Sequence, residues 1–214
     1  MKPAIIYIAS VFGISLLGAL PPGYLNSLAV AAWNPQNPLQ TGNFILGICL
    51  PEWLVVSFLV RLLAFRSPSP TLLFALKLIN GTFLCGVAVF FACSAFLQTP
   101  PISAFPMVQP LQLGLTLGVL NPAVWVFWIG YIFQAQTKNK PPQSFGFIVL
   151  IGLAAALGNM AGMWGFVLGY HALINPHSMG VSTILYLLAA LFLAVAGVMQ
   201  WVGMCKFKVG RFKV

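Results

Sequence analysis

Glu52 is the only acidic residue in this 214-residue sequence, and long apolar runs flank it on both sides. Placing a carboxyl group near the centre of a membrane-spanning helix costs roughly 2.5–3.5 kcal/mol on insertion scales, so such a residue normally has a role or a partner. In that setting a carboxyl group can carry a proton or bind a cationic group such as an amine. The alternative is structural, with Glu52 permanently protonated, or paired with Lys77 or Asn80, and fastening the second and third helices.

Two proline motifs interrupt other apolar runs, namely Pro21-Pro22-Gly23 and Asn121-Pro122. Proline has no N–H, and its ring displaces the carbonyl one turn earlier, so a helix kinks or unwinds there. Backbone groups freed at membrane depth must be satisfied by protein or by a water-lined cavity. We therefore predict a break in each helix, with the backbone around these motifs open to a solute. A simple packing kink is the alternative.

A few further polar side chains fall within the apolar runs. They are Tyr24, Asn26, Ser27, Asn80, Asn159 and Trp164. Together with Glu52 they are candidate groups for binding a solute or protons, although intramembrane Ser and Asn often only hydrogen-bond a neighbouring helix.

Small residues also recur at a spacing of four, as Ala154, Gly158 and Gly162 and as Gly114 and Gly118. This spacing lets two helix backbones approach closely. We expect packing within the chain, and the same faces leave a homodimer contact open.

The composition indicates which elements must hold these groups. Hydrophobic residues make up 60% of the sequence and charged residues 5%, against roughly a quarter charged in a soluble domain. A spanning helix needs about 20 apolar residues. Six runs fit, at Ala4 to Ala32, Thr41 to Leu63, Leu72 to Leu97, Leu111 to Phe133, Phe145 to Leu173 and Thr183 to Met204. We predict an all-α integral membrane protein with six transmembrane helices, the first and fourth broken at their proline motifs.

The lysines and arginines predict the orientation of these spans. With six spans, all of them fall on the side shared by both termini, and the opposite loops hold only His171 and His177, which we expect to be exposed loop residues. Excess Lys and Arg marks the cytoplasmic side, so both termini are expected in the cytoplasm. The net charge of +9 then reflects orientation rather than nucleic-acid binding. A signal peptide cleaved near Ser27 to Ala31 is the alternative for the first run.

Enzymatic chemistry is not indicated. A single acid cannot form a catalytic pair, and no H-E-x-x-H, P-loop or G-x-S-x-G motif occurs. The four cysteines, Cys49, Cys85, Cys93 and Cys205, lack C-x-x-C spacing and are expected to be buried small hydrophobes. We therefore expect no enzymatic activity, no cofactor and no metal centre.

An internal repeat relates the two proline motifs. Leu17 to Gly23 aligns with Leu117 to Ala123 and keeps leucine, glycine, leucine and proline in register. The later spans align more loosely, with Gly47 near Gly152. Because the first span would run outward and the fourth inward, the halves would form an inverted repeat, which is common among secondary transporters. We predict a first three-helix repeat at 1–98, an outer linker at 99–110, a second repeat at 111–204 and a basic cytoplasmic tail at 205–214.

Several motifs follow the order and spacing found in one known family. They are Pro21-Pro22-Gly23-Tyr24, the second-helix stretch with Gly42, Gly47 and Pro51-Glu52, the third-helix start Leu76-Lys77-Leu78 with Gly81, and Leu120-Asn121-Pro122. Over nearly its whole length the chain resembles the LysE/RhtB family of small bacterial amino-acid exporters. The sequence departs from the family pattern at Tyr24, where a second proline is usual, at Pro51, where glycine is usual, and after Pro122, where no lysine follows.

The resemblance implies export of amino acids or similar small metabolites, driven by the proton gradient across the bacterial plasma (inner) membrane. Glu52 would bind the amino group or the proton, and half-helix N-termini would face a carboxylate. The expected partners are an amino-acid-like solute, protons and the lipid bilayer, with no nucleic acid. Two alternatives stay open. One is export of a metal cation, although metals want more oxygen, nitrogen or sulfur ligands than the spans offer; the other is a non-transporting membrane scaffold.

Overall fold

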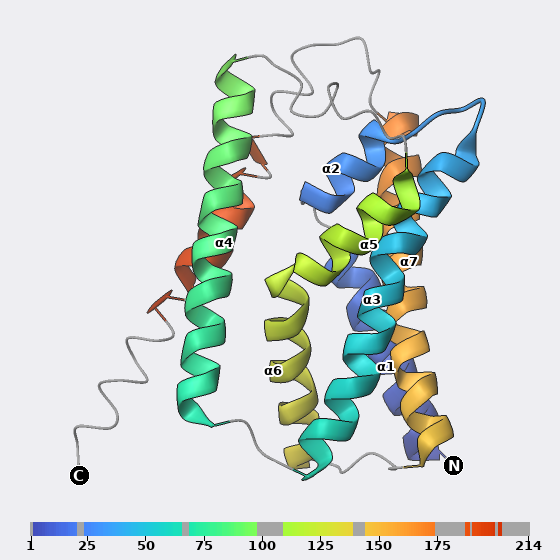
Figure 1. Ribbon diagram of the computed structural model, residues 1–214, viewed down its shortest axis with the longest axis vertical. Helices are drawn as coiled ribbons and strands as arrows, with labels where there is room; N and C mark the ends of the chain where they lie inside the picture. Colours follow the sequence, from blue (N-terminus) through green and yellow to red (C-terminus); the bar gives the residue numbers. More distant parts are fainter. Residues whose placement is uncertain are drawn as a thin grey trace. The chain divides into compact units, whose positions relative to one another are not determined.

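The computed structural model describes residues 2–20, 24–65, 69–97, 109–138, 144–173, 187–188, 190–199 and 201–202. Within these ranges all regular structure is α-helical, which confirms the predicted all-α class. The helices are α1 (Lys2–Ala19), α2 (Tyr24–Ala31), α3 (Pro38–Phe65), α4 (Pro70–Leu97), α5 (Pro110–Leu120), α6 (Pro122–Lys138) and α7 (Phe145–Leu173), as labelled in Figure 1. A shorter apolar helix follows at Ala190–Met199.

Prolines set the starts of four helices. The first residues of α3, α4, α5 and α6 are Pro38, Pro70, Pro110 and Pro122. Proline suits this position because its backbone angle is already helical and the missing N–H would have no partner inside the helix. At α4 the hydroxyl of Ser69 also accepts the Leu72 N–H at 3.1 Å, which caps the helix.

Three unbroken helices are long and apolar enough to cross a membrane, at Pro38–Ala64, Pro70–Cys93 and Phe145–Ala172. They match the second, third and fifth predicted spans. The sixth predicted span, Thr183 to Met204, lies partly outside the described residues. Its described part includes the shorter apolar helix Ala190–Met199.

Two further spans are bent pairs of helices. The chain turns by 72° between Ala4–Ala19 and Tyr24–Ala31, and by 53° between Pro110–Leu120 and Pro122–Phe133. The second bend is visible in Figure 1 where α5 meets α6. These bends fall at the two proline motifs, as predicted, and with them the described residues hold up to five spans.

The chain divides into two compact units. Unit 1 comprises Met1–Ser67 and Ile102–Asn175, and so contains α1, α2, α3, α5, α6 and α7. Unit 2 comprises Pro68–Pro101 and Pro176–Val214, and contains α4 and the Ala190–Met199 helix. Each unit contains segments from both predicted repeats, so the boundaries of the packing units do not coincide with those of the predicted repeats.

Most outward-facing side chains of the long helices are apolar, with Asn43 and Arg61 of α3 among the exceptions. On α3 they include Leu46, Leu54, Phe58 and Leu62, and on α7 Leu150, Leu153, Leu157 and Leu168. Six polar side chains are buried among the described residues, namely Ser15, Asn26, Thr41, Glu52, Asn80 and Asn121. A soluble protein exposes its polar groups to water, whereas lipid-facing helices must turn theirs inward. This distribution, like the long apolar helices, is consistent with a membrane-embedded protein.

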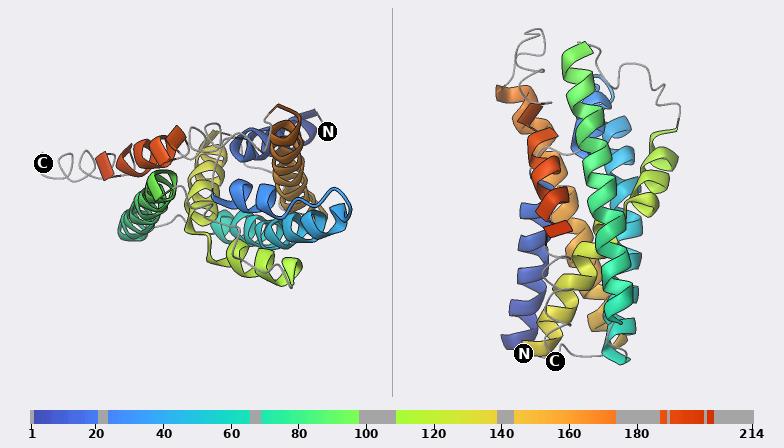
Figure 2. Two further views of the ribbon diagram at one scale, coloured as in Figure 1. Left: turned by 90° about the horizontal axis from the view of Figure 1, so that it is seen from above. Right: turned by 90° about the vertical axis from the view of Figure 1, so that its left-hand side faces the viewer.

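The closest helix crossings in unit 1 are made by glycines. α3 packs along α5, and α1 packs along α7 (Figure 2). A Cβ atom on Gly47 or Gly114 would overlap backbone atoms of the facing helix at the α3·α5 crossing. The same holds for Gly158 and Gly162 at the α1·α7 crossing. The predicted glycine-spaced faces therefore pack within the chain.

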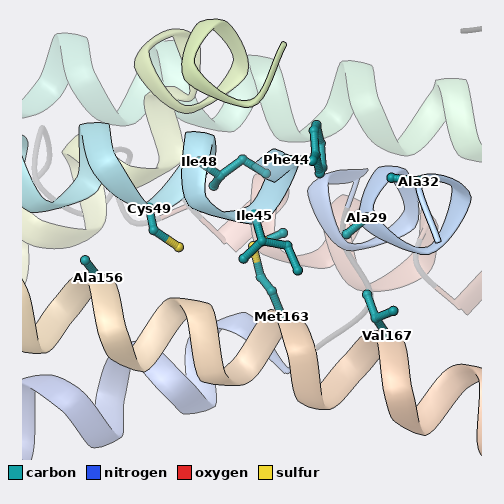
Figure 3. Close-up of a cluster of buried hydrophobic side chains, with 9 residues drawn as sticks. All are labelled: Ala29, Ala32, Phe44, Ile45, Ile48, Cys49, Ala156, Met163 and Val167. Carbon is teal, nitrogen blue, oxygen red and sulfur yellow. The ribbon is translucent and has the colours of Figure 1, made fainter. Parts of the chain in front are cut away.

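An apolar cluster joins α2, α3 and α7. Figure 3 shows it, with Met163 of α7 pointing toward Ile45 of α3 and with Ala29 of α2 beside them. Cys49 belongs to this cluster, as expected for a cysteine that packs as a small hydrophobe. The hydroxyl of Thr41 at the start of α3 donates to the Ala32 carbonyl at 2.8 Å, which ties α3 to the end of the α2 segment.

We predict that Gly114→Ala destabilises the α3·α5 crossing. The added methyl group would overlap the Phe44 carbonyl and lie 3.0 Å from the Gly47 Cα, and overpacking of this kind typically costs about 1–3 kcal/mol. The midpoint of thermal unfolding, followed by tryptophan fluorescence in detergent, should fall. Gly130→Ala on α6 is the matched control, because a methyl group there meets nothing within 4 Å. Equal midpoints for the two variants would contradict the crossing as described.

Candidate functional site

The carboxyl group of Glu52 lies at the meeting point of four helices. Its side chain is 5% exposed. Oε1 accepts a hydrogen bond from the indole Nε1 of Trp128 at 2.8 Å, and it lies 3.3 Å from the hydroxyl of Ser15. Oε2 accepts a hydrogen bond from the side-chain amide of Asn159. The partners come from α6, α1 and α7, so this one group links α3 to three other helices.

The α1·α7 crossing holds two of these partners in place. The Ser15 hydroxyl also lies 2.8 Å from the carbonyl of Ala155, one turn before Asn159 on α7. Ser15 packs against Gly158, where a Cβ atom would lie 3.0 Å from the Ser15 Cβ. Only a glycine lets α1 approach α7 closely enough for this. Glu52, Ser15, Ala155 and Asn159 thus form a closed ring of polar contacts across α3, α1 and α7.

Both helix breaks lie close to Glu52. Ser15 is one turn before Ala19, the last residue of α1. Gly118 in the last full turn of α5 faces Pro51, the neighbour of Glu52, and a Cβ there would lie 3.1 Å from the Pro51 Cγ. The C-terminal ends of two half-helices therefore approach the level of the carboxyl group.

Side-chain amides satisfy backbone groups at both breaks. The Asn26 amide donates to the Ala19 carbonyl at 2.6 Å. This carbonyl lies at the end of α1, where the helix itself supplies no N–H donor. Asn121 adopts an extended backbone between α5 and α6, and its Oδ1 accepts the Ala123 N–H at 3.1 Å. Asn121 is thus the N-cap of α6, with Pro122 as the first helical residue.

The predicted site residues of unit 1 fall into three groups. Glu52 and Asn159 are in direct contact, while Asn26, Asn121 and Pro122 lie at the two breaks, with Tyr24 as the first residue of α2. Pro22 and Gly23 lie outside the described residues.

Asn80 lies on α4 in unit 2. It is buried, and its Oδ1 has no hydrogen-bond partner among the described residues. Lys77 lies on the same helix. Pairing of either residue with Glu52 stays a prediction. The described partners of Glu52 come instead from α1, α6 and α7.

Sequence reasoning missed Ser15 and Trp128. Ser15 sits seven residues before Pro22 and Trp128 six residues after Pro122, so both lie within about 9–11 Å of a break along the helix axis at 1.5 Å per residue. That depth is a usable signal for both. It does not say which helices are neighbours, and only neighbouring helices bring these groups to Glu52.

His171 was expected to be an exposed loop residue, and this expectation is wrong. It lies in the last turn of α7, and its ring stacks on Trp33 with centroids 5.4 Å apart. Trp164 meets the same Trp33 ring edge-on at 6.1 Å. α7 has the bounds of the fifth predicted span, Phe145 to Leu173, so His171 belongs to the helix, and these rings give it a packed surface. His177 lies outside the described residues.

The described residues contain no group of three His, Cys, Asp or Glu side chains placed to hold a metal ion. Cys49, Cys85 and Cys93 are free thiols. Cys49 is buried as expected, whereas Cys85 is partly buried and Cys93 is exposed on the apolar α4, so the expectation of burial is wrong for Cys93. Cys205 lies outside the described residues. Comparisons of the chain with protein-family models, with curated proteins and with solved structures give no match.

We predict that Trp128→Phe destabilises the protein because a buried carboxyl oxygen loses a donor. The loss should be about 1–3 kcal/mol, the usual cost of leaving a buried polar group short of a partner. Unfolding in detergent with increasing denaturant measures it. Trp125→Phe, the same change one turn earlier on α6, is the control.

A Glu52→Met background provides the second half of the test. With no carboxyl group to bind, the cost of Trp128→Phe should vanish or reverse. An undiminished cost in that background would show that Trp128 stabilises the protein by packing alone.

Proposed function

We propose that the protein is a secondary transporter that exports amino acids or similar small metabolites, by proton antiport, across a bacterial plasma membrane. In this proposal it is a six-helix protein of the LysE/RhtB type with both termini in the cytoplasm. The observation that carries the proposal is the enclosed carboxyl group of Glu52, held by Ser15, Trp128 and Asn159 next to two helix breaks.

The chemistry around Glu52 suits a group that changes its charge. Its described partners are a hydroxyl, an indole and an amide, none of which is cationic. A carboxylate without a counter-charge is costly to bury, and a bound proton or a solute's amino group would remove that cost. A site that takes either one in turn is what antiport requires.

The helix contacts support the predicted inverted repeat. Exchange of the two halves of the chain turns the α1·α7 contact into α5·α3, and α2·α7 into α6·α3, and all four contacts occur in unit 1. Within unit 2, Gly81 of α4 faces the Gly197 carbonyl of the last helix, which pairs the third span with the sixth. By their places in the two main crossings, Gly47 of α3 is equivalent to Gly158 of α7. The looser sequence alignment had placed Gly47 near Gly152.

The breaks supply complementary ends for a zwitterion. The C-termini of α1 and α5 carry partial negative charge and lie near Glu52, on the side where an amino group would bind. The N-termini of α2 and α6 carry partial positive charge and suit a carboxylate. A small amino acid therefore fits this arrangement better than a simple anion does.

Transport in proteoliposomes tests the proposal. With an imposed pH gradient and a panel of amino acids, at least one solute should move in exchange for protons, and Glu52→Gln should abolish the coupled flux because an amide carries no proton. Thr116→Val on the exposed side of α5 is the control, since its hydroxyl bonds only within its own helix, to the Gln112 carbonyl at 2.9 Å. A coupled flux that is unchanged in Glu52→Gln would show that Glu52 is not the coupling group.

In the scaffold alternative, Glu52 only fastens helices together. The scaffold and transporter interpretations differ in whether water reaches the helix breaks. In a variant without the native cysteines, Gly23→Cys and Asn121→Cys should react with a membrane-impermeant thiol reagent, because a solute path passes the breaks. Val11→Cys, at a fully buried position, should stay unreactive. If the cysteines at 23 and 121 are as inert as the one at 11, the scaffold interpretation is favoured.

A further inference from the structure

The Ser15 hydroxyl faces two acceptors but has one hydrogen to give. The Ala155 carbonyl lies 2.8 Å from its oxygen and Glu52 Oε1 lies 3.3 Å away. The shorter distance is the usual one for an O–H···O bond, and the longer one is beyond the usual range. The geometry thus favours donation to Ala155, and it leaves a lone pair of the Ser15 oxygen facing the carboxyl group.

A protonated carboxyl group needs an acceptor, and the described partners of Glu52 offer one. Trp128 Nε1 and Asn159 Nδ2 can only donate. A hydroxyl can both donate and accept. Of the two described partners of Oε1, Ser15 is therefore the one that can serve it in both protonation states of Glu52.

We propose that Ser15 is a positioning residue that exchanges its hydrogen-bond partner when Glu52 gains or loses a proton. When Glu52 is ionised, the Ser15 O–H donates to Oε1 and joins α1 to α3. When Oε1 binds a proton, its new O–H donates to the Ser15 oxygen, and the Ser15 O–H turns to the Ala155 carbonyl and joins α1 to α7. No other bond is made or broken, and the proton stays on Glu52.

This exchange gives proton binding a mechanical consequence. α1 is the half-helix that ends at the first break, and its hold on α7 would be stronger when Glu52 is protonated. A ligand shifts a conformational equilibrium only through a difference in its interactions with the two states, and this exchange supplies such a difference for the proton. The inference rests on the proposed function, because it assumes that Glu52 carries the coupling proton.

The surroundings of Glu52 contain few other groups that could take part. The titratable side chains on the packed helices are Lys2 and Tyr7 on α1, Tyr24 on α2, Cys49 and Arg61 on α3, Tyr131 and Lys138 on α6, and Tyr170 and His171 on α7, while α5 carries none. Lys2, Lys138 and His171 lie ten or more residues along their helices from Ser15, Trp128 and Asn159. Ordinary tyrosine and cysteine side chains are uncharged at neutral pH. Arg61 is nine residues further along α3, roughly 13 Å at 1.5 Å per residue.

Infrared difference spectroscopy between high and low pH tests the exchange in the full-length protein in lipid. A carbonyl band of protonated Glu52, identified by its loss in Glu52→Gln, should move to higher wavenumber in Ser15→Ala because the acid O–H loses its acceptor. Ser10→Ala is the matched control on the same helix, since the Ser10 hydroxyl bonds the Ile6 carbonyl at 2.8 Å, and it should leave the band unmoved. Ser15→Cys keeps the shape with a weaker acceptor and should shift the band in the same direction.

The outcomes separate this inference from the proposed function. A Glu52 band that is unmoved in both Ser15→Ala and Ser15→Cys would overturn the exchange, even if Glu52-dependent flux is present. A shifted band without flux of any solute would support the exchange and count against transport of the solutes tried. The absence of a Glu52 band at every pH would overturn both the exchange and the role of Glu52 as proton carrier.

Discussion

A carboxyl group enclosed by apolar helices must find its hydrogen-bond partners inside the protein, because hydrocarbon offers none. For Glu52 those partners come from α1, α6 and α7, so the positions of three helices relative to α3 are tied to one side chain. In water each of these contacts would be worth little. In an apolar interior an unpaired carboxyl group is costly, which is why a single acid can specify the arrangement of four helices.

The glycine crossings make that arrangement attainable. Ser15 has one of the shortest polar side chains, so it reaches both Ala155 and Glu52 only because Gly158 lets the α1 and α7 backbones come into contact. On the other side of α3, Gly47 and Gly114 bring the end of α5 to Pro51. The ends of the two half-helices lie near the carboxyl group because the helix backbones pack closely, and not because long side chains bridge a gap.

The sequence predicts the helices of this fold far better than it predicts which helices pack against one another. Apolar length and proline position located the three long apolar helices and the two bent pairs of helices with their breaks, since both signals act locally along the chain. The cost of an intramembrane acid singled out Glu52, and polarity at depth singled out Asn159. Ser15 and Trp128 escaped because Ser and Trp are unremarkable in a membrane helix until a partner is known. That partner depends on which helices touch, and no local pattern encodes this.

The two asparagines at the breaks already have hydrogen-bond partners within the chain. Asn26 and Asn121 were candidates for binding a solute, yet their side chains already bond the Ala19 carbonyl and the Ala123 N–H. Each satisfies a backbone group that the break itself sets free, so the breaks are stable without any solute. A solute that entered here would have to displace these bonds or use the backbone groups they leave. In either case it would change how firmly the half-helices are joined, so a self-capped break next to a protonatable carboxyl group can respond both to a solute and to a proton.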